Sequence, residues 1–291
     1  MTFLSIVIVL LFLQVWGSGE PLQKDGWFWR WVDTLKASDG VKQIPVGVTL
    51  FAVAGPVLLV LIITAICHDL WYGTLLLLIN VPVLLFSLGR GDFSQRVAAY
   101  LNAWRRGDME AAYFEADYFR GECHPSEAKS WQQLHIEVFQ GVAYRGFERL
   151  FVTLFWFFLF GAAGALAYRL LFLLREKQCS DIAISRVDSV VHGMEWIPVR
   201  LLSFSMALAG NFIGSFQHWQ AFLTDWNQTT EDLLVTTATG AIGVKGGLID
   251  ESENLRRQLT ECAWEIESLV SLLSRCLMVW VIAFAALTVL V

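Results

Sequence analysis

The chain has 291 residues, of which 56% are apolar and only 16% are charged, and its net charge is −6. About a quarter of the residues in soluble domains are charged, so this composition argues against a soluble globular protein. The acidic balance argues against nucleic-acid binding, because phosphate contacts need clustered Lys and Arg. The five cysteines form no CxxC pair, which argues against a zinc site. A mean hydropathy of +0.53, with 13 Trp residues suited to membrane boundaries, predicts an integral membrane protein.

The N-terminal region, 1–88, contains three apolar segments and a polar loop. No basic residue precedes the first segment, 3–16, so we expect an uncleaved membrane helix and not a removed signal peptide. Segments 44–67 and 70–88 are separated by two polar residues, which is typical of a transmembrane helical hairpin. The loop 17–43 carries three alternating Trp residues, interpreted as an anchor at the membrane surface.

The next region, 89–149, is charged, and its apolar residues recur with the period of a helix. Asp92 is a favourable N-cap. The helix that follows would carry one apolar stripe, formed by Val97, Tyr100, Leu101 and Trp104. Gly107 and Asp108 would end this helix and begin another. The region is therefore expected to form amphipathic helices in the cytoplasm.

A membrane helix is predicted over 150–174, where apolar residues again form a long run. Gly161 and Gly164 would let a neighbouring helix pack closely against it. Arg169 lies near the far end of the run, where its long side chain would reach the membrane surface.

The remainder of the chain, 175–275, is predicted to be helical, with a bent and partly membrane-embedded segment over 188–216. An apolar helix over 276–291 closes the chain. Basic residues favour the cytoplasmic side of a bilayer, and they are abundant in the polar loop and in the charged region. Both are expected in the cytoplasm, whereas the side that 175–275 occupies depends on whether 196–216 crosses. The fold class expected is all-α: a polytopic α-helical integral membrane protein with amphipathic cytoplasmic helices.

Ionisable residues gather just before the apolar part of 188–216. On a helix, Asp188, His192 and Glu195 share one face and form a candidate site for a divalent metal ion. Pro198 cannot donate to the carbonyl of the residue four positions earlier, so the helix should kink or restart. Arg200 follows as a candidate phosphate ligand. The alternative is structural: an acid of this face pairs with Arg200, and Pro198 begins the next helix.

A glycine-rich run near residue 240 is a second candidate for binding an anion. Gly240, Gly243 and Lys245 could contact a phosphate through backbone amides and an ammonium group, together with Arg169 and Arg200. Their spacing does not match the G-x-x-x-x-G-K-[ST] pattern of a phosphate-binding loop. A glycine hinge is the alternative interpretation.

The run DSVVHGMEWIPVRL over 188–201 resembles the signature of the AmpE family. The blocks YRGFERLFVTLFW over 144–156 and GAAGALAYR over 161–169 resemble that family as well. The resemblance implies a multi-pass protein of the bacterial inner membrane that modulates signalling in β-lactamase induction and cell-wall stress. It favours a regulator over an enzyme. The implied partners are the lipid bilayer and either a cytoplasmic protein or a cell-wall fragment.

AmpE proteins are similar in turn to the CbiB/CobD membrane synthases of cobalamin biosynthesis. That likeness rests on GAAGALAYR, on WIPVRL over 196–201, and on the glycine-rich run. It implies an alternative function, a Mg-ATP-dependent synthase of the adenosylcobinamide-phosphate type. Two polar elements of those synthases are replaced here, one by the apolar run Leu171–Leu174. The resemblance therefore implies an eroded active site, with Mg-ATP as the cofactor if activity survives.

Overall fold

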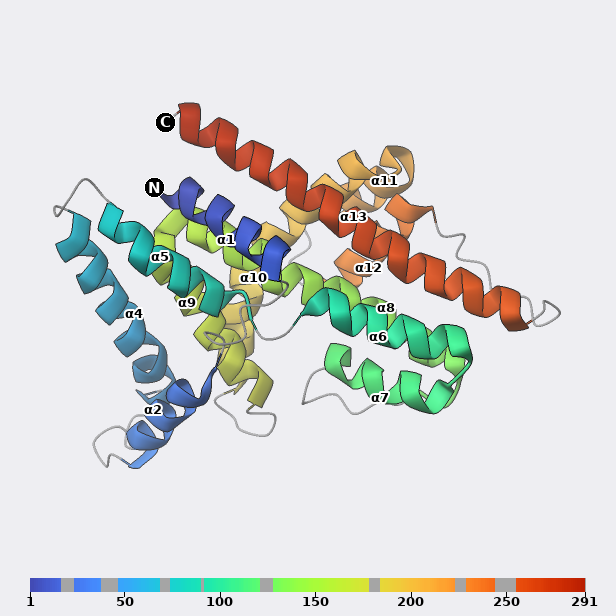
Figure 1. Ribbon diagram of the computed structural model, residues 1–291, viewed down its shortest axis with the longest axis horizontal. Coiled ribbons are helices and arrows are strands. Elements are labelled where there is room, and N and C mark those ends of the chain that lie inside the picture. The colour runs from blue at the N-terminus through green and yellow to red at the C-terminus, as the bar shows by residue number, and fades with distance from the viewer. Residues whose placement is uncertain are drawn as a thin grey trace. The chain divides into compact units, whose positions relative to one another are not determined.

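The computed structural model describes residues 1–16, 24–37, 47–68, 74–89, 92–120, 128–177, 184–222, 229–243 and 255–290. Every regular element within these ranges is a helix (Figure 1), which confirms the all-α class. The helices belong to two compact units. Unit 1 combines Met1–Asp92 with Val152–Met194, and unit 2 combines Phe93–Phe151 with Glu195–Val291.

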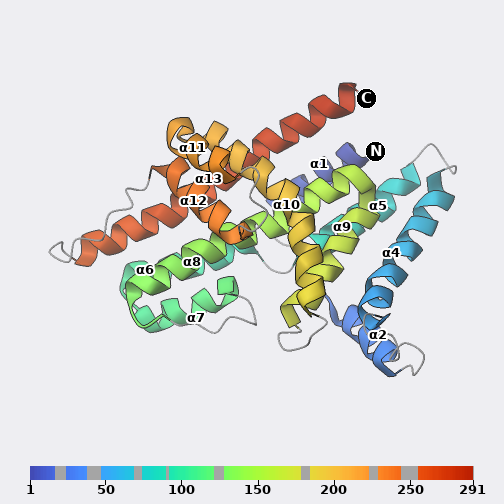
Figure 2. The ribbon, with the colours of Figure 1, turned by 180° about the vertical axis from the view of Figure 1, so that it is seen from behind.

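Unit 1 is built from apolar helices that pack around one central helix. Its elements are α1 (Thr2–Trp16), α2 (Gly26–Ala37), α4 (Gly47–His68), α5 (Thr74–Ser87), α9 (Thr153–Lys177) and the first part of α10 (Ile184–Ala209). Helices α4 and α5 both pack against α9, and α1 packs against α5, as Figures 1 and 2 show from opposite sides. The expected starts at Ile44 and Leu70 lie outside the described residues.

Helix α4 has the length and the surface of a membrane-spanning helix. Its stretch Val48–Cys67 is long and apolar enough to cross a bilayer. Large apolar side chains cover its outer face, among them Leu58 at 56% and Ile62 at 58% exposure. A row of such side chains is stable against lipid but not against water.

Helix α9 is broken at Gly161, which departs from the single membrane helix expected over 150–174. Gly161 has φ 65° and ψ −153°, a conformation that side-chain-bearing residues rarely adopt. A Cβ on Gly164 would lie 2.5 Å from the carbonyl oxygen of Trp156. Eight residues of straight helix would separate these positions by about 12 Å. The chain therefore turns sharply at Gly161, and Gly164 packs against the preceding arm.

Unit 2 contains the remaining helices. They are α6 (Phe93–Arg106), α7 (Met109–Arg120), α8 (Trp131–Gly146), the π-helix η2 (Phe147–Val152), α11 (Phe212–Phe222), α12 (Thr230–Ile242), α13 (Leu255–Leu290) and the end of α10. The α6–α7 pair packs on α8, and both α6 and α8 contact α13. All four residues of the predicted α6 stripe are buried, which confirms that face. Burial raises the pKa of the Tyr100 phenol, which therefore stays neutral.

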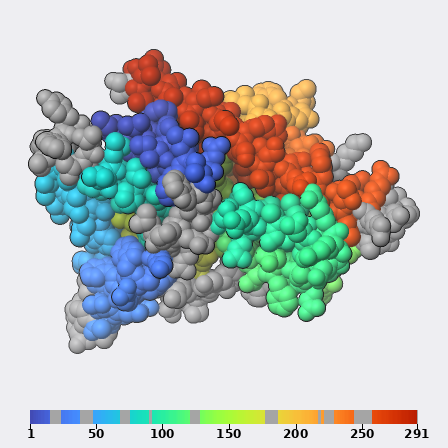
Figure 3. Space-filling view, in the orientation of Figure 1, coloured from blue at the N-terminus to red at the C-terminus, as the bar shows by residue number. Residues whose placement is uncertain are grey.

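Two long helical runs pass from polar into apolar sequence. Helix α13 continues without a break from its amphipathic first half into the apolar 276–290 segment, so a separate final helix was wrong. Residues Trp131–Glu176 form a run of consecutive helical elements through α8, η2 and α9, which turns at Gly161. Together with α4, these runs give three helices long and apolar enough to span a membrane within the described ranges. Figure 3 shows α13 along one surface of the molecule.

Candidate functional site at the proline-containing helix

The signature segment lies within one continuous helix, α10, and Pro198 is inside it. The helix does not restart near Glu195, and the alternative in which Pro198 begins the next helix was wrong. The boundary between the two units nevertheless falls in this helix, between Met194 and Glu195. The side chains of the segment are described below within the unit to which each belongs.

An indole replaces the backbone bond that Pro198 removes. In a regular helix the N–H of residue 198 would donate to the carbonyl of Met194, but proline has no N–H. The Trp156 Nε1–H on α9 donates to that carbonyl instead, over 3.1 Å. The freed carbonyl is therefore satisfied by a side chain, as a proline in an apolar helix requires.

Glu195 is one of the most buried ionisable residues of unit 2, with 2% of its surface exposed. Its Oε1 accepts a hydrogen bond of 2.7 Å from the Tyr144 hydroxyl on α8. A buried carboxylate needs such donors, because removing its charge from water without partners is very unfavourable. Glu195 is thus held by α8 in the interior of the unit.

Arg200 is held by aromatic residues. Its guanidinium lies 3.9 Å from the ring centroid of Trp196, and its Nη1 donates to the Trp196 carbonyl over 3.0 Å. The Arg200 carbonyl accepts from the Trp219 Nε1–H on α11, also over 3.0 Å. A cation stacked on an indole is stabilised by the negative face of the ring. The expected pairing of Arg200 with an acid of the same helix stays a prediction.

The three residues proposed as metal ligands are not brought together. Asp188 Oδ1 lies 3.1 Å from Arg175 Nε on α9, and both side chains are partly exposed. His192 is partly buried, and Glu195 is bound by Tyr144. No group of three His, Cys, Asp or Glu side chains in the described part of the chain is close enough to hold a metal ion. The metal site therefore stays a prediction without structural support.

Arg169 is an interior residue, so the expectation that it reaches the membrane surface was wrong. Arg169 is 5% exposed, and its Nη2 lies 3.7 Å from Oδ2 of Asp25, which is itself 3% exposed. Gly89 lies against the guanidinium, since a Cβ there would be 3.3 Å from Nη1, and its φ of 80° suits glycine. No pattern in the sequence indicated that Asp25 is the partner of Arg169. A buried arginine in an apolar run needs an acidic partner, but several acidic residues of the chain could have supplied it.

The glycine-rich run has structural roles where it is described. Gly240 packs against Gly214 of α11, because a Cβ on either residue would lie 2.7 Å from the carbonyl oxygen of the other. Gly243 is the left-handed C-cap of α12, with φ 76°. Lys245 lies outside the described residues. An anion site at this run remains a prediction, and the described glycines are explained by helix packing and capping.

The sequence interpretation missed the two indoles that hold α10. Trp156 and Trp219 are distant in sequence from the carbonyls that they bind. The available signal was indirect: a proline within an apolar helix frees a carbonyl, and the chain's 13 Trp residues each carry an indole N–H that can donate to it. Which Trp supplies the bond depends on the tertiary packing.

Comparison with known proteins places these observations in a family. A family model described as regulatory signalling modulator protein AmpE matches residues 1–250. The chain is 26% identical over 258 residues to protein AmpE of Shigella flexneri, covering 82% of this chain and 84% of that protein. It is 22% identical over 181 residues to cobalamin biosynthesis protein CobD of Chromobacterium violaceum, covering 59% of this chain and 56% of that protein. No solved structure matches the chain.

The family model spans most of the chain and includes all of α10 with its signature segment. The apolar, all-helical structure agrees with a membrane protein. The resemblance found in the sequence is confirmed: this chain belongs to the AmpE family of regulatory signalling modulators.

Proposed function

We propose that this chain is a multi-pass protein of the bacterial inner membrane that modulates the response to cell-wall stress, including the induction of a β-lactamase. The observation that carries the proposal is the match of the regulatory signalling modulator family over residues 1–250. The relative from Shigella flexneri, which covers most of both chains, supports the same function. The polar loop and the α6–α8 region would lie in the cytoplasm, where their basic residues favour them.

The geometry of α10 suits a regulator better than an enzyme. Arg200 stacks on an indole, Glu195 accepts from a phenol, and Asp188 pairs with a guanidinium. Side chains engaged in this way hold a helix in position and do not form a convergent catalytic set. A signalling modulator needs an element with two arrangements of similar free energy. We expect the indole–carbonyl bond beside Pro198 to provide such an element, because its opening would leave the backbone bonds of the helix intact.

A cytoplasmic protein partner has a candidate surface on α7. Tyr113 and Phe114 of this helix are 40% and 69% exposed. Aromatic side chains are enriched in protein–protein interfaces relative to other surfaces. Helix α7 belongs to the region that we place in the cytoplasm, so a soluble protein could reach it. A cell-wall fragment is the other ligand class that the proposal allows.

The alternative function, a Mg-ATP-dependent cobalamin-type synthase, has weaker support. The CobD relative matches 59% of this chain, whereas the AmpE relative matches 82%. The described candidates for a phosphate site are engaged in other contacts: Arg169 with Asp25, and Gly240 with Gly214.

The proposal is tested by deleting the gene in its own bacterium and measuring β-lactamase activity after a sub-inhibitory β-lactam. Deletion should change induction, and the wild-type gene on a plasmid should restore it. An unchanged response would contradict the regulatory function. Titration of the purified protein with Mg-ATP tests the alternative, since saturable binding would favour the synthase.

A further inference from the structure

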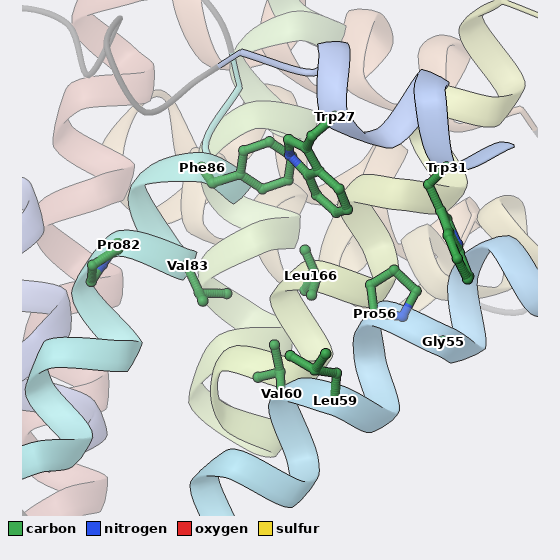
Figure 4. A pocket seen from close by; sticks show the side chains of 10 residues that line it. All are labelled: Trp27, Trp31, Gly55, Pro56, Leu59, Val60, Pro82, Val83, Phe86 and Leu166. Atoms are coloured by element: carbon green, nitrogen blue, oxygen red, sulfur yellow. The ribbon is translucent and has the colours of Figure 1, made fainter. Parts of the chain in front are cut away.

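Unit 1 contains a cavity of about 510 Å³ between α2, α4, α5 and α9. Figure 4 shows its lining residues arranged around an open space, with Trp27 and Phe86 near one end and Leu59 and Val60 near the other. Ligand pockets in proteins have volumes of about 300–1,000 Å³, so this cavity is large enough for a small molecule or a chain segment.

The lining of this cavity selects a hydrocarbon. All of its residues are aliphatic or aromatic apart from a glycine, and the only side-chain polar groups are the two indole N–H groups. A charged or strongly polar ligand would lose its hydration here and gain no matching partner, which is unfavourable. An alkyl chain loses no hydrogen bond on entering and gains dispersion contacts with the wall. The chemistry therefore fits the chain of a lipid.

The cavity lies beside a surface that suits lipid. Leu59 lines the cavity and is also 57% exposed, and its neighbour Leu58 on the outer face of α4 is 56% exposed. The same residue thus belongs to both the cavity wall and the apolar outer surface of a membrane-spanning helix. A chain can enter laterally from the bilayer without crossing water.

Helix α2 offers a place for the polar end of such a lipid. Trp27 and Trp31, one turn apart on α2, both line the cavity and are 39% and 38% exposed. The Trp31 ring is kept close to α4 by Gly55, where a Cβ would lie 3.2 Å from it. Half-exposed indoles favour the headgroup level of a membrane. The exposed cation Arg30 lies on the same helix, within reach of a phosphate at that level.

We propose that this cavity binds one acyl chain of a membrane phospholipid, with the lipid phosphate beside Arg30. The site lies within unit 1 and is distinct from the α10 segment. The proposal does not depend on the regulatory function.

The test uses the purified full-length protein in nanodiscs of phosphatidylethanolamine and phosphatidylglycerol. A small fraction of the phosphatidylethanolamine carries a diazirine in the middle of one acyl chain. After illumination, mass spectrometry of peptides locates the crosslinks. We expect labels on the inner walls, near Val83 of α5 and Leu166 of α9, in addition to those on the exposed face of α4.

Filling the cavity should remove the inner labels. Leu166→Trp places a large ring inside it, and Val83→Phe serves as a second variant if the first does not fold. Leu58→Trp adds comparable bulk on the outer face of α4 and is the matched control. Loss of most of the labelling on α5 and α9 in the filled variants, with none lost in the control, supports the site.

A second readout concerns the headgroup. Arg30→Gln should lower the amount of phospholipid that stays bound to the protein in native mass spectrometry. Two results overturn the proposal: inner walls that carry no label in protein shown to be folded, or labelling that the filled variants leave unchanged. Labelling confined to the outer face of α4 would mean that lipid only surrounds the helix.

Discussion

The bond between the Trp156 indole and the Met194 carbonyl yields a sharp test of the site. Trp156→Phe removes the donor and leaves the carbonyl without the partner that replaces the missing N–H of Pro198. Pro198→Ala restores a backbone N–H in the position that normally bonds this carbonyl. The two substitutions should therefore interact. Trp156→Phe should destabilise the wild-type protein more than it destabilises the Pro198→Ala variant.

The size of the interaction follows from the environment of the bond. A buried polar group left without its hydrogen bond costs about 1–3 kcal/mol. This bond is 3.1 Å long and partly buried, so we expect about 1–2 kcal/mol. The packing lost when an indole becomes a phenyl ring is common to both backgrounds and cancels in the comparison.

The free energies of unfolding can be measured by titrating the four proteins from a mild detergent into sodium dodecyl sulfate and following helix content by circular dichroism. Circular dichroism is preferred to Trp fluorescence because the Trp156→Phe substitution itself removes a fluorescent residue. An interaction energy below about 0.3 kcal/mol, the usual error of such cycles, would refute the role assigned to the indole.

Two further predictions use the same unfolding measurement. Asp25→Asn leaves the buried Arg169 without its ion-pair partner and should cost about 3–5 kcal/mol, whereas Glu261→Gln, in an exposed pair on α13, should cost less than about 1 kcal/mol. Equal losses would mean that the buried pair is not formed. Gly240→Ala brings a Cβ to 2.7 Å from a backbone oxygen of α11 and should cost about 1–3 kcal/mol. Gly193→Ala meets nothing within 4 Å and should be neutral or stabilise by up to about 1 kcal/mol, so a loss there would contradict the packing argument.

Features that depend on neighbouring residues in the sequence could be predicted. Apolar runs marked α1, α4 and α5, of which α4 is long enough to cross a bilayer, and the helical period of apolar residues marked the buried face of α6. Asp108 was expected to begin a helix, and its Oδ1 accepts from the Ala111 amide in the first turn of α7. Each of these signals is local, because hydrophobic periodicity and capping act within a few residues.

Features that depend on distant contacts could not be predicted. Gly161 was interpreted as a packing glycine, but it has a positive φ at the point where the chain turns and brings Gly164 back against Trp156. The continuity of α13 was missed because its first half is amphipathic and its second half is apolar, and the two halves read as different elements. A change in surroundings along one helix does not require a break in its backbone.

The candidate site shows the same division. The signature around Pro198 identified the segment and the family, and Arg200 and Glu195 are indeed held by specific contacts. Tyr144 and Trp219 come from other helices and were not predictable, whereas Trp196, which holds the Arg200 guanidinium, lies four residues earlier on the same helix. A pattern on one helix shows which side chains share a face, but packing decides which of them meet. That is why the sequence pattern predicted a metal-binding face. In the described residues, Asp188, His192 and Glu195 nevertheless do not form a cluster that could hold a metal ion.

The central claim is that the Pro198 segment of α10 carries the regulatory function. The most direct measurement compares β-lactamase induction in cells whose gene is replaced by either Arg200→Ala or Gly193→Ala, at equal abundance of the protein in the membrane. The first removes the guanidinium stacked on Trp196, and the second changes the same helix where nothing lies within 4 Å. We expect Arg200→Ala to reproduce the effect of deleting the gene and Gly193→Ala to behave as wild type. A wild-type response from both variants would contradict the claim.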